Sequence, residues 1–309
     1  MMYMMTGTLN MADLANRIPM VADTRTIQVA IAFIIVGLGL KLAIFPLHMW
    51  LPNAYTFAPS VVTVFLAATA TKVAVYALLR MVFTVFGGAP LLVVAQALMI
   101  LAVIAMFVGS LVAIYQSNIK RMLAYSSIAQ IGYMVLGISF ISAIGLTGGI
   151  IHLFNHALVK GALFMAVGCM FLRLESVRLE DMAGLGKRMP LTMACFLIAG
   201  LGLIGVPLTA GFISKWYLVL AAFHSDMWYI AVLILASSLL AVIYVWRVVE
   251  VAYFKPVSPR TREIAEAPVS MLVPLFMLTG ASVYFGIDAT RTLDIASDAA
   301  NFLMRGMMP

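Results

Sequence analysis

The sequence predicts an all-α integral membrane protein with about eight transmembrane helices, two of them broken. Of the 309 residues, 64% are hydrophobic and only 10% are charged, which is far more apolar than a soluble domain. Apolar runs of the roughly 20 residues needed to cross a bilayer core recur from residue 26 to residue 287. Proline interrupts two of these runs beside glycine, so we expect those two helices to break within the membrane.

The apolar runs divide the chain into three parts. We expect residues 1–25 to form a short apolar segment and an amphipathic linker, residues 26–287 the transmembrane domain, and residues 288–309 a C-terminal tail. The N-terminus lacks the basic start, apolar core and cleavage site of a secretory signal peptide. The eight expected spans are residues 26–50, 60–86, 91–115, 121–141, 145–172, 191–222, 227–253 and 269–287.

The net charge of +7 reports orientation in a cell (inner) membrane rather than binding to nucleic acid, because most exposed basic residues flank the spans. The loops after spans one, three, five and seven collect Lys120, Arg121, Arg173, Arg178, Lys187, Arg188, Lys255, Arg260 and Arg262. The opposite side holds Arg17, Arg25, Arg291 and Arg305 in its loops and tails. The positive-inside rule therefore places the first group, including Lys120 and Arg121 at the start of a span, in the cytoplasm and the C-terminus outside.

The two helix breaks lie in similar surroundings. Pro46 follows Lys41 in the first span, and Pro207 and Gly211 precede Lys215 in the sixth. Discontinuous helices in corresponding places are typical of transporter repeats. Membrane helices also carry glycine and proline without any transport role, so the breaks alone leave both explanations open.

Four lysines fall inside the predicted spans: Lys41, Lys72, Lys160 and Lys215. A charged side chain at this depth is costly, so each is expected to face the protein interior. Burial favours the neutral amine, which allows such a lysine to exchange a proton if water reaches it. Snorkelling would explain one lysine near a helix end, but four favour a functional explanation.

His152, His156 and Lys160 follow one another at intervals of four, so they form a stripe about 12 Å long on one helix face. The stripe is a candidate proton relay. A histidine pair at this spacing also fits a metal site, but no carboxylate or thiol nearby completes one, so we predict no metal. Packing is the other alternative, in which each histidine bonds a neighbouring helix.

The acidic residues and the cofactor motifs set limits on this relay. All twelve Asp and Glu residues fall in loops, tails or span ends, so another segment or subunit is expected to supply any acidic partner of the lysines. No Rossmann fingerprint, Walker A sequence or cysteine cluster is present, so we predict no cofactor. Cys169 and Cys195 lie in apolar runs and are expected to be packing residues.

Ordered motifs carry a family resemblance. FPLHMWLPNAYTFAPS, TKVAVYALLR, NIKRMLAYSSIAQIGYM, the His-His-Lys stripe and GVPLTAGFISKWYLV follow one another in the chain. Together they resemble the antiporter-like membrane subunits shared by Mrp cation/proton antiporters and the proton-pumping arm of respiratory complex I. The segment LEDMAGLGKRMPLTMACFLIAGLGLIGVPLTAGFISKWYLV is most similar to the D subunit of Mrp antiporters.

The resemblance implies a fourteen-helix fold with inverted repeats, of which this chain would be the last eight spans, an N-terminally truncated member. Lys41 would match the lysine of the broken seventh helix, Lys72 that of the eighth, and Lys215 the ionisable residue of the broken twelfth. His152, His156 and Lys160 would match the central relay. The fifth-helix glutamate that pairs with the seventh-helix lysine in the family is absent from this sequence, and Asn118 replaces an aspartate often found before Ile-Lys-Arg.

Three functions remain open from the sequence. The first is a proton-translocating subunit of a monovalent cation/proton antiporter. It would work with other membrane subunits to exchange H⁺ for Na⁺ or K⁺. The second is a proton-pumping subunit of complex I or a related membrane-bound hydrogenase. The third is a membrane scaffold that transports nothing.

Overall fold

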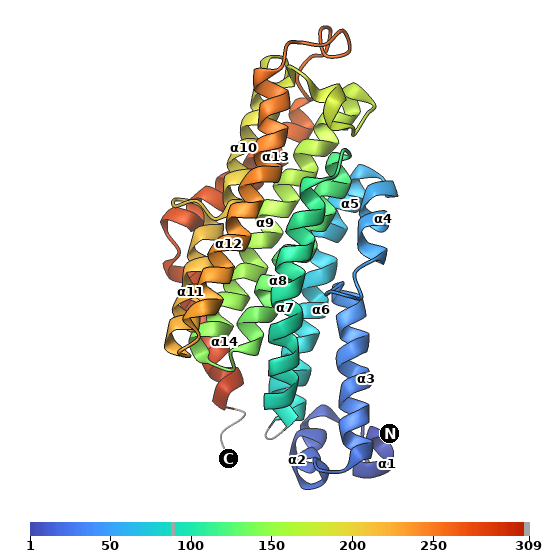
Figure 1. Ribbon diagram of the computed structural model, residues 1–309, viewed down its shortest axis with the longest axis vertical. Helices are drawn as coiled ribbons and strands as arrows, with labels where there is room; N and C mark the ends of the chain where they lie inside the picture. Colours follow the sequence, from blue (N-terminus) through green and yellow to red (C-terminus); the bar gives the residue numbers. More distant parts are fainter. Residues whose placement is uncertain (88–89, 306–309) are drawn as a thin grey trace.

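The computed structural model describes residues 1–87 and 90–305 as an elongated helical bundle (Figure 1). The α-helices are α1 (Met2–Thr6), α2 (Met11–Val21), α3 (Arg25–Leu42), α4 (Trp50–Phe57), α5 (Ser60–Phe65), α6 (Thr71–Leu79), α7 (Pro90–Ile114), α8 (Ile119–Ser139), α9 (Ala143–Leu174), α10 (Pro190–Ile204), α11 (Ala210–His224), α12 (Trp228–Val249), α13 (Val269–Ile287) and α14 (Thr290–Arg305). Short π-helices are η1 (Leu66–Ala70), η2 (Arg80–Phe86) and η5 (Glu250–Phe254), and the 3₁₀-helices are η3 (Leu179–Met182) and η4 (Leu185–Lys187).

The helix lengths confirm a membrane protein. In the part of the chain that the structure describes, seven continuous helical runs are long and apolar enough to cross a bilayer. The number is eight if the segments Leu179–Lys187 and Pro190–Ile204, which are bent by 112° relative to each other, are counted together as one span. The seven are Arg25–Leu42, Ser60–Phe86, Leu92–Ile114, Ile119–Ser139, Ala143–Leu174, Trp228–Phe254 and Val269–Ile287. The predicted span 191–222 is instead divided between α10 and α11, each of 15 residues and so too short to cross alone.

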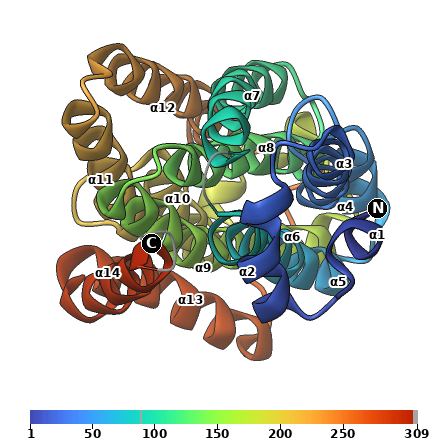
Figure 2. The ribbon, with the colours of Figure 1, turned by 90° about the horizontal axis from the view of Figure 1, so that it is seen from below.

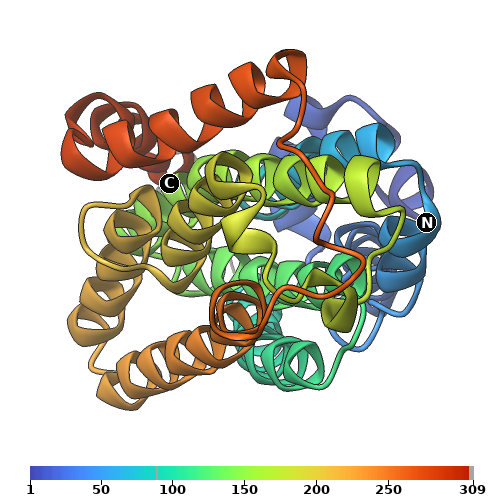
Figure 3. The same cartoon turned by 90° about the horizontal axis from the view of Figure 1, so that it is seen from above.

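Helices α8 and α9 form the centre of the bundle. Seen from below, α7 and α12 lie on one side of them, α3 and α6 on another, and α11, α13 and α14 on a third (Figure 2). Seen from above, α13 runs obliquely along one edge of the bundle (Figure 3). All but one of the residues of α8 are buried, and α9 packs against α8, α10, α11, α13 and α14. Polar side chains on α8 and α9 are therefore held away from lipid.

The first break, around Pro46, separates α3 from α4. Ala43 ends α3 in the left-handed conformation (φ 59°), and residues 43–49 are not helical. The Trp50 indole N–H donates to the carbonyl of Leu40 at 2.8 Å, which satisfies one of the acceptors at the end of α3.

The second break lies between α10 and α11 at residues 205–209 and contains Pro207. Gly205 ends α10 at φ +90°, a backbone conformation that residues other than glycine rarely adopt. Gly211 lies in the first turn of α11, and a Cβ there would stand 1.9 Å from the carbonyl oxygen of Gly202. The two half-helices therefore touch backbone to backbone, as only glycine permits.

We predict that Gly211→Ala destabilises the protein severely, by about 3 kcal/mol or more, because neither backbone can yield without breaking the helices. Gly280→Ala in α13 is the matched control, since its Cβ would meet no atom within 4 Å. Thermal unfolding of the detergent-solubilised protein measures both. Equal melting temperatures for Gly211→Ala and Gly280→Ala would contradict the close contact.

The basic loops gather at one end of the bundle, while α1, α2 and the end of α14 lie at the other (Figure 1). At the basic end, Arg260 and Asp181 form an ion pair at 2.7 Å that joins the loops before α10 and α13. Residues 290–305 of the predicted tail form the helix α14, whose Ala296 and Ala300 are buried. In the predicted linker, Asn10 caps α2 by accepting from the backbone N–H groups of Ala12 and Asp13.

Glu266 closes the start of α10. Its carboxylate accepts from the Leu191 N–H at 2.8 Å and from the Thr192 hydroxyl at 2.6 Å, and its carbonyl accepts from the Arg173 guanidinium at 2.7 Å. A carboxylate at a helix N-terminus satisfies free N–H groups and interacts favourably with the helix dipole. Glu266 thus ties the end of α9 to the start of α10.

We predict that Glu266→Ala lowers the free energy of unfolding by about 1–2 kcal/mol, because the first turn of α10 loses its cap. Glu263→Ala provides the control, because Glu263 is an exposed acid three residues earlier in the same loop. Chemical or thermal unfolding compares the two, and an equal loss of stability in both would refute the capping role.

Candidate functional site

Three of the four predicted lysines are buried together with both predicted histidines in the centre of the bundle. Lys72 lies on α6, Lys160, His156 and His152 lie on α9, and Lys215 lies on α11. Lys160 is fully buried, with 0% exposure. Among the described residues, the ion pairs are Arg17–Asp13 and Arg260–Asp181, so none of these lysines pairs with an acid.

Lys72 is held by an irregular helix. Residues Leu66–Ala70 immediately before α6 are π-helical, and the Lys72 ammonium donates to the carbonyl of Ala67. A π-turn shifts the usual hydrogen-bond pattern and leaves a backbone carbonyl for another donor. The irregular turn therefore supplies an acceptor for a cation that would otherwise be buried without one.

A cavity of about 870 Å³ reaches Lys72 from the surface between α6, α9 and α14. Tyr76 and Arg80 line it from the α6 side, and Asp298 and Arg305 line it from α14. Asp298 therefore brings a carboxylate to the wall of the same cavity, although the two groups form none of the ion pairs found in the described chain. Water entering here would meet the Lys72 side chain.

Lys160 lies against the start of α8. Its ammonium donates to the carbonyl of Leu123 at 2.7 Å and to the hydroxyl of Ser126, and it lies 5.8 Å from the Phe164 ring centre. Ser126 and Ser127 also donate to the Leu123 carbonyl, at 2.9 and 3.0 Å. The two serines therefore bond a helix carbonyl, and Ser126 in addition contacts the Lys160 ammonium.

The two histidines differ in their partners. His152 Nδ1 lies 2.8 Å from the Ser214 hydroxyl, and His152 Nε2 lies 3.0 Å from the Gln130 amide oxygen. The His156 ring stacks on that of His152 with a centroid distance of 6.1 Å. Neither nitrogen of His156 has a hydrogen-bond partner among the described residues.

A small cavity lies beside the histidines. Its volume is about 10 Å³, close to the smallest space that holds one water molecule. The buried side-chain amide oxygen of Asn155 has no partner within the described chain either, and Asn155 lines this cavity together with His156. Unpartnered buried polar atoms are costly, so a bound water is the simplest way to satisfy them.

Lys215 lies under the second helix break. Its ammonium donates to the carbonyls of Leu203 and Ile204 at 3.2 and 2.7 Å and to the Ser238 hydroxyl at 2.9 Å. The carbonyls belong to the last turn of α10, where the break leaves them free and the helix dipole favours a cation. The ammonium also lies 4.7 Å from the centre of the Tyr133 ring.

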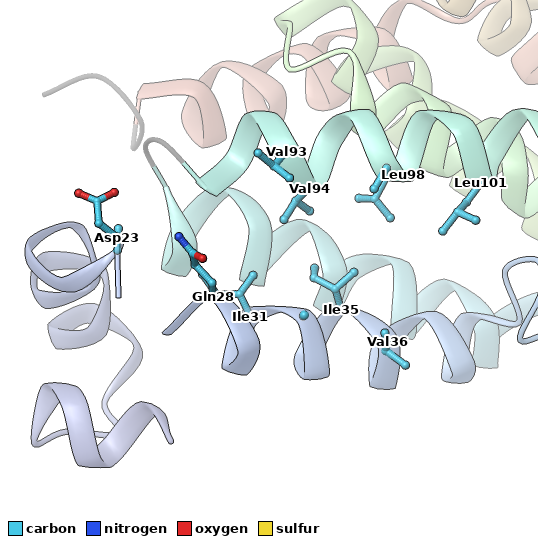
Figure 4. Close-up of a pocket in the computed structure, with 12 residues that line it drawn as sticks. Asp23, Gln28, Ile31, Ile35, Val36, Val93, Val94, Leu98 and Leu101 are labelled. Atoms are coloured by element: carbon cyan, nitrogen blue, oxygen red, sulfur yellow. The ribbon is translucent and has the colours of Figure 1, made fainter. Parts of the chain in front are cut away.

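Lys41 differs from the prediction that it faces the protein interior, because it is exposed in the described chain. Helix α3 packs against α6 on one side, but a groove of about 510 Å³ separates it from α7 (Figure 4). Apolar side chains such as Ile31, Ile35, Val94 and Leu98 face this groove. The structure therefore does not bring Lys41 into the buried row.

Lys120 and Arg121 open α8 at the basic end of the bundle. Lys120 donates to the carbonyl of Ala58 at 3.2 Å and lies 5.2 Å from the Phe171 ring centre. Asn118 caps the helix by accepting from the Arg121 N–H at 3.1 Å, which takes the place of an acidic cap. His48 within the first break is buried and stacks on Phe45.

Sequence reasoning missed four polar residues of this site: Gln130, Tyr133, Ser214 and Ser238. One signal was available, since Ser126, Gln130 and Tyr133 recur at helical spacing within an apolar run. Within residues 1–87 and 90–305, no group of three or more His, Cys, Asp or Glu side chains could hold a metal ion.

Residues 1–241 match the NADH:quinone oxidoreductase/Mrp antiporter transmembrane family. The chain belongs to this family. It is 44% identical over 299 residues to the N subunit of NADH-quinone oxidoreductase from Desulforudis audaxviator, an alignment that covers 93% of this chain and 60% of the relative. It is 33% identical over 288 residues to the D subunit of the Na(+)/H(+) antiporter from Alkalihalophilus pseudofirmus, which covers 93% of this chain and 58% of the relative.

The fold agrees with this assignment. A chain in the solved Mrp complex from Dietzia sp. DQ12-45-1b matches with a TM-score of 0.88 at 25% identity, over 99% of this chain and 66% of that chain. The present chain thus spans about 60% of the length of the curated relatives it matches. The higher identity to the oxidoreductase N subunit favours the complex I alternative over the expected Mrp D subunit, since the motifs behind that expectation belong to a family that includes both.

Proposed function

We propose that this chain is a proton-translocating membrane subunit of a redox-driven assembly of the complex I type, working beside other membrane subunits. The observation that carries the proposal is the buried row of three lysines and two histidines, in which carbonyls and hydroxyls rather than carboxylates hold the lysines. Groups without a fixed counter-charge can lose a proton as well as gain one. A permanent ion pair would hold the proton in place.

Repulsion between neighbouring groups couples one proton movement to the next. His152 and Lys160 are eight residues apart on α9, which is about 12 Å along the helix. At an effective dielectric constant of about 20, two positive charges at that distance repel by about 1.4 kcal/mol. This amounts to about a tenfold change in proton affinity, so charging one site favours proton release from the other.

A second candidate is a subunit of a monovalent cation/proton antiporter, which the 33% identity to the D subunit of an Na(+)/H(+) antiporter supports. The two proposals differ in what drives the protons. In membrane vesicles that contain the complete complex, adding an electron donor together with a quinone as electron acceptor should build a pH gradient if the assembly is redox-driven. A gradient that responds only to added Na⁺ or K⁺ would favour the antiporter.

We predict that Lys160→Ala and Lys215→Ala in the complete complex each abolish proton translocation while leaving the complex assembled. Lys187→Ala is the control, since Lys187 is an exposed loop lysine at the basic end. The pH gradient across vesicles is the measurement, with native gels to establish assembly. Normal gradients in both buried-lysine variants would leave only a scaffold role.

We also propose that the basic end of the bundle faces the cytoplasm and that the C-terminus lies outside. The basic loops before α8, α10 and α13 support this orientation through the positive-inside rule. A C-terminal alkaline phosphatase fusion should then be active and a green fluorescent protein fusion dark. The reverse result would invert the topology.

A further inference from the structure

The hydrogen bonds around His152 determine which of its nitrogens carries a fixed proton. Ser214 is fully buried, and its hydroxyl lies 2.8 Å from His152 Nδ1 and 3.0 Å from the carbonyl oxygen of Gly211. A serine has one proton to donate, and the carbonyl can only accept. When Ser214 donates to Gly211, it can only accept from His152, so Nδ1 bears a hydrogen.

The other nitrogen of His152 is then the one that gains and loses a proton. Nε2 faces the side-chain amide of Gln130 at 3.0 Å, and Gln130 is only 2% exposed. A primary amide has an accepting oxygen and a donating NH₂ group, and a half-turn of the amide exchanges them. The oxygen suits protonated Nε2, and the NH₂ group suits bare Nε2. Gln130 can therefore satisfy both charge states of His152.

We infer that Gln130 is a positioning residue that turns its amide as His152 gains or loses the proton on Nε2, so that one side chain satisfies both charge states of His152. The inference rests on the proposed function. Gln130 carries no proton itself. The proton that Nε2 gains comes from water in the small cavity, which Gln130, His152 and His156 all line, and it returns to water there when Nε2 loses it.

Other titratable groups also face His152 from its own helix and from the surrounding helices. Tyr133 on α8 packs against its ring at 5.4 Å, and His156 stacks on it from the same helix. Lys215 on α11 and Lys72 on α6 add positive charge. These groups are unchanged in variants of Gln130. A shift in the pH profile of proton translocation in such variants is therefore caused by the loss or alteration of the Gln130 amide.

Two substitutions at Gln130 test the inference in opposite directions. The carboxylate of Gln130→Glu only accepts and is itself negative, so it holds Nε2 protonated. The pH profile of proton translocation should move up by about one unit or more. Gln130→Met fills the space without a hydrogen bond, so the charged imidazole loses its acceptor. Translocation should slow about tenfold, and its profile should move to lower pH.

Gln116→Met is the matched control, because Gln116 at the end of α7 bonds the Val112 carbonyl away from the relay and its replacement should leave rate and profile unchanged. All variants are compared with Lys160→Ala in vesicles containing the assembled complex. If both Gln130 variants keep the wild-type pH profile while Lys160→Ala is inactive, the role of Gln130 is overturned and the proposed function stands. Full activity in Lys160→Ala would instead remove the proposed function.

Discussion

The burial of ammonium groups in a bilayer protein is the constraint on which this structure depends. A lysine at that depth must find acceptors, and an intact helix offers few because its carbonyls already bond its own N–H groups. Two of the three lysines of the row lie where helical bonding is interrupted. Lys72 bonds a carbonyl of a π-helix, and Lys215 bonds the open end of α10. The irregularities are therefore part of the site.

The third lysine uses a different source of acceptors. Lys160 shares the carbonyl of Leu123 with two serines and takes the hydroxyl of Ser126 as a further acceptor. Aromatic rings add attraction without a full counter-charge, since Lys160 lies near Phe164 and Lys215 lies near Tyr133. Such partners stabilise the cation without preventing loss of the proton.

The sequence predicted the membrane fold, both breaks and the buried row because each leaves a local signal: long apolar runs, proline beside glycine, and lysine within an apolar run. It failed for Lys41, whose exposure depends on which helices pack beside α3. The π-helix before Lys72 has no such signal. Gln130 and Ser214 come from two helices, so only the tertiary structure shows that they meet at one histidine.

The contact between Gly211 and Gly202 has a mechanical consequence. Two backbones that touch leave no free volume for α11 to slide or tilt past α10, so the break is a rigid joint rather than a hinge. The carbonyls that hold Lys215 are then fixed in space. Under the proposed function, protons would then pass Lys215 through small rotations of side chains and their own movement, with α10 and α11 as a stationary frame.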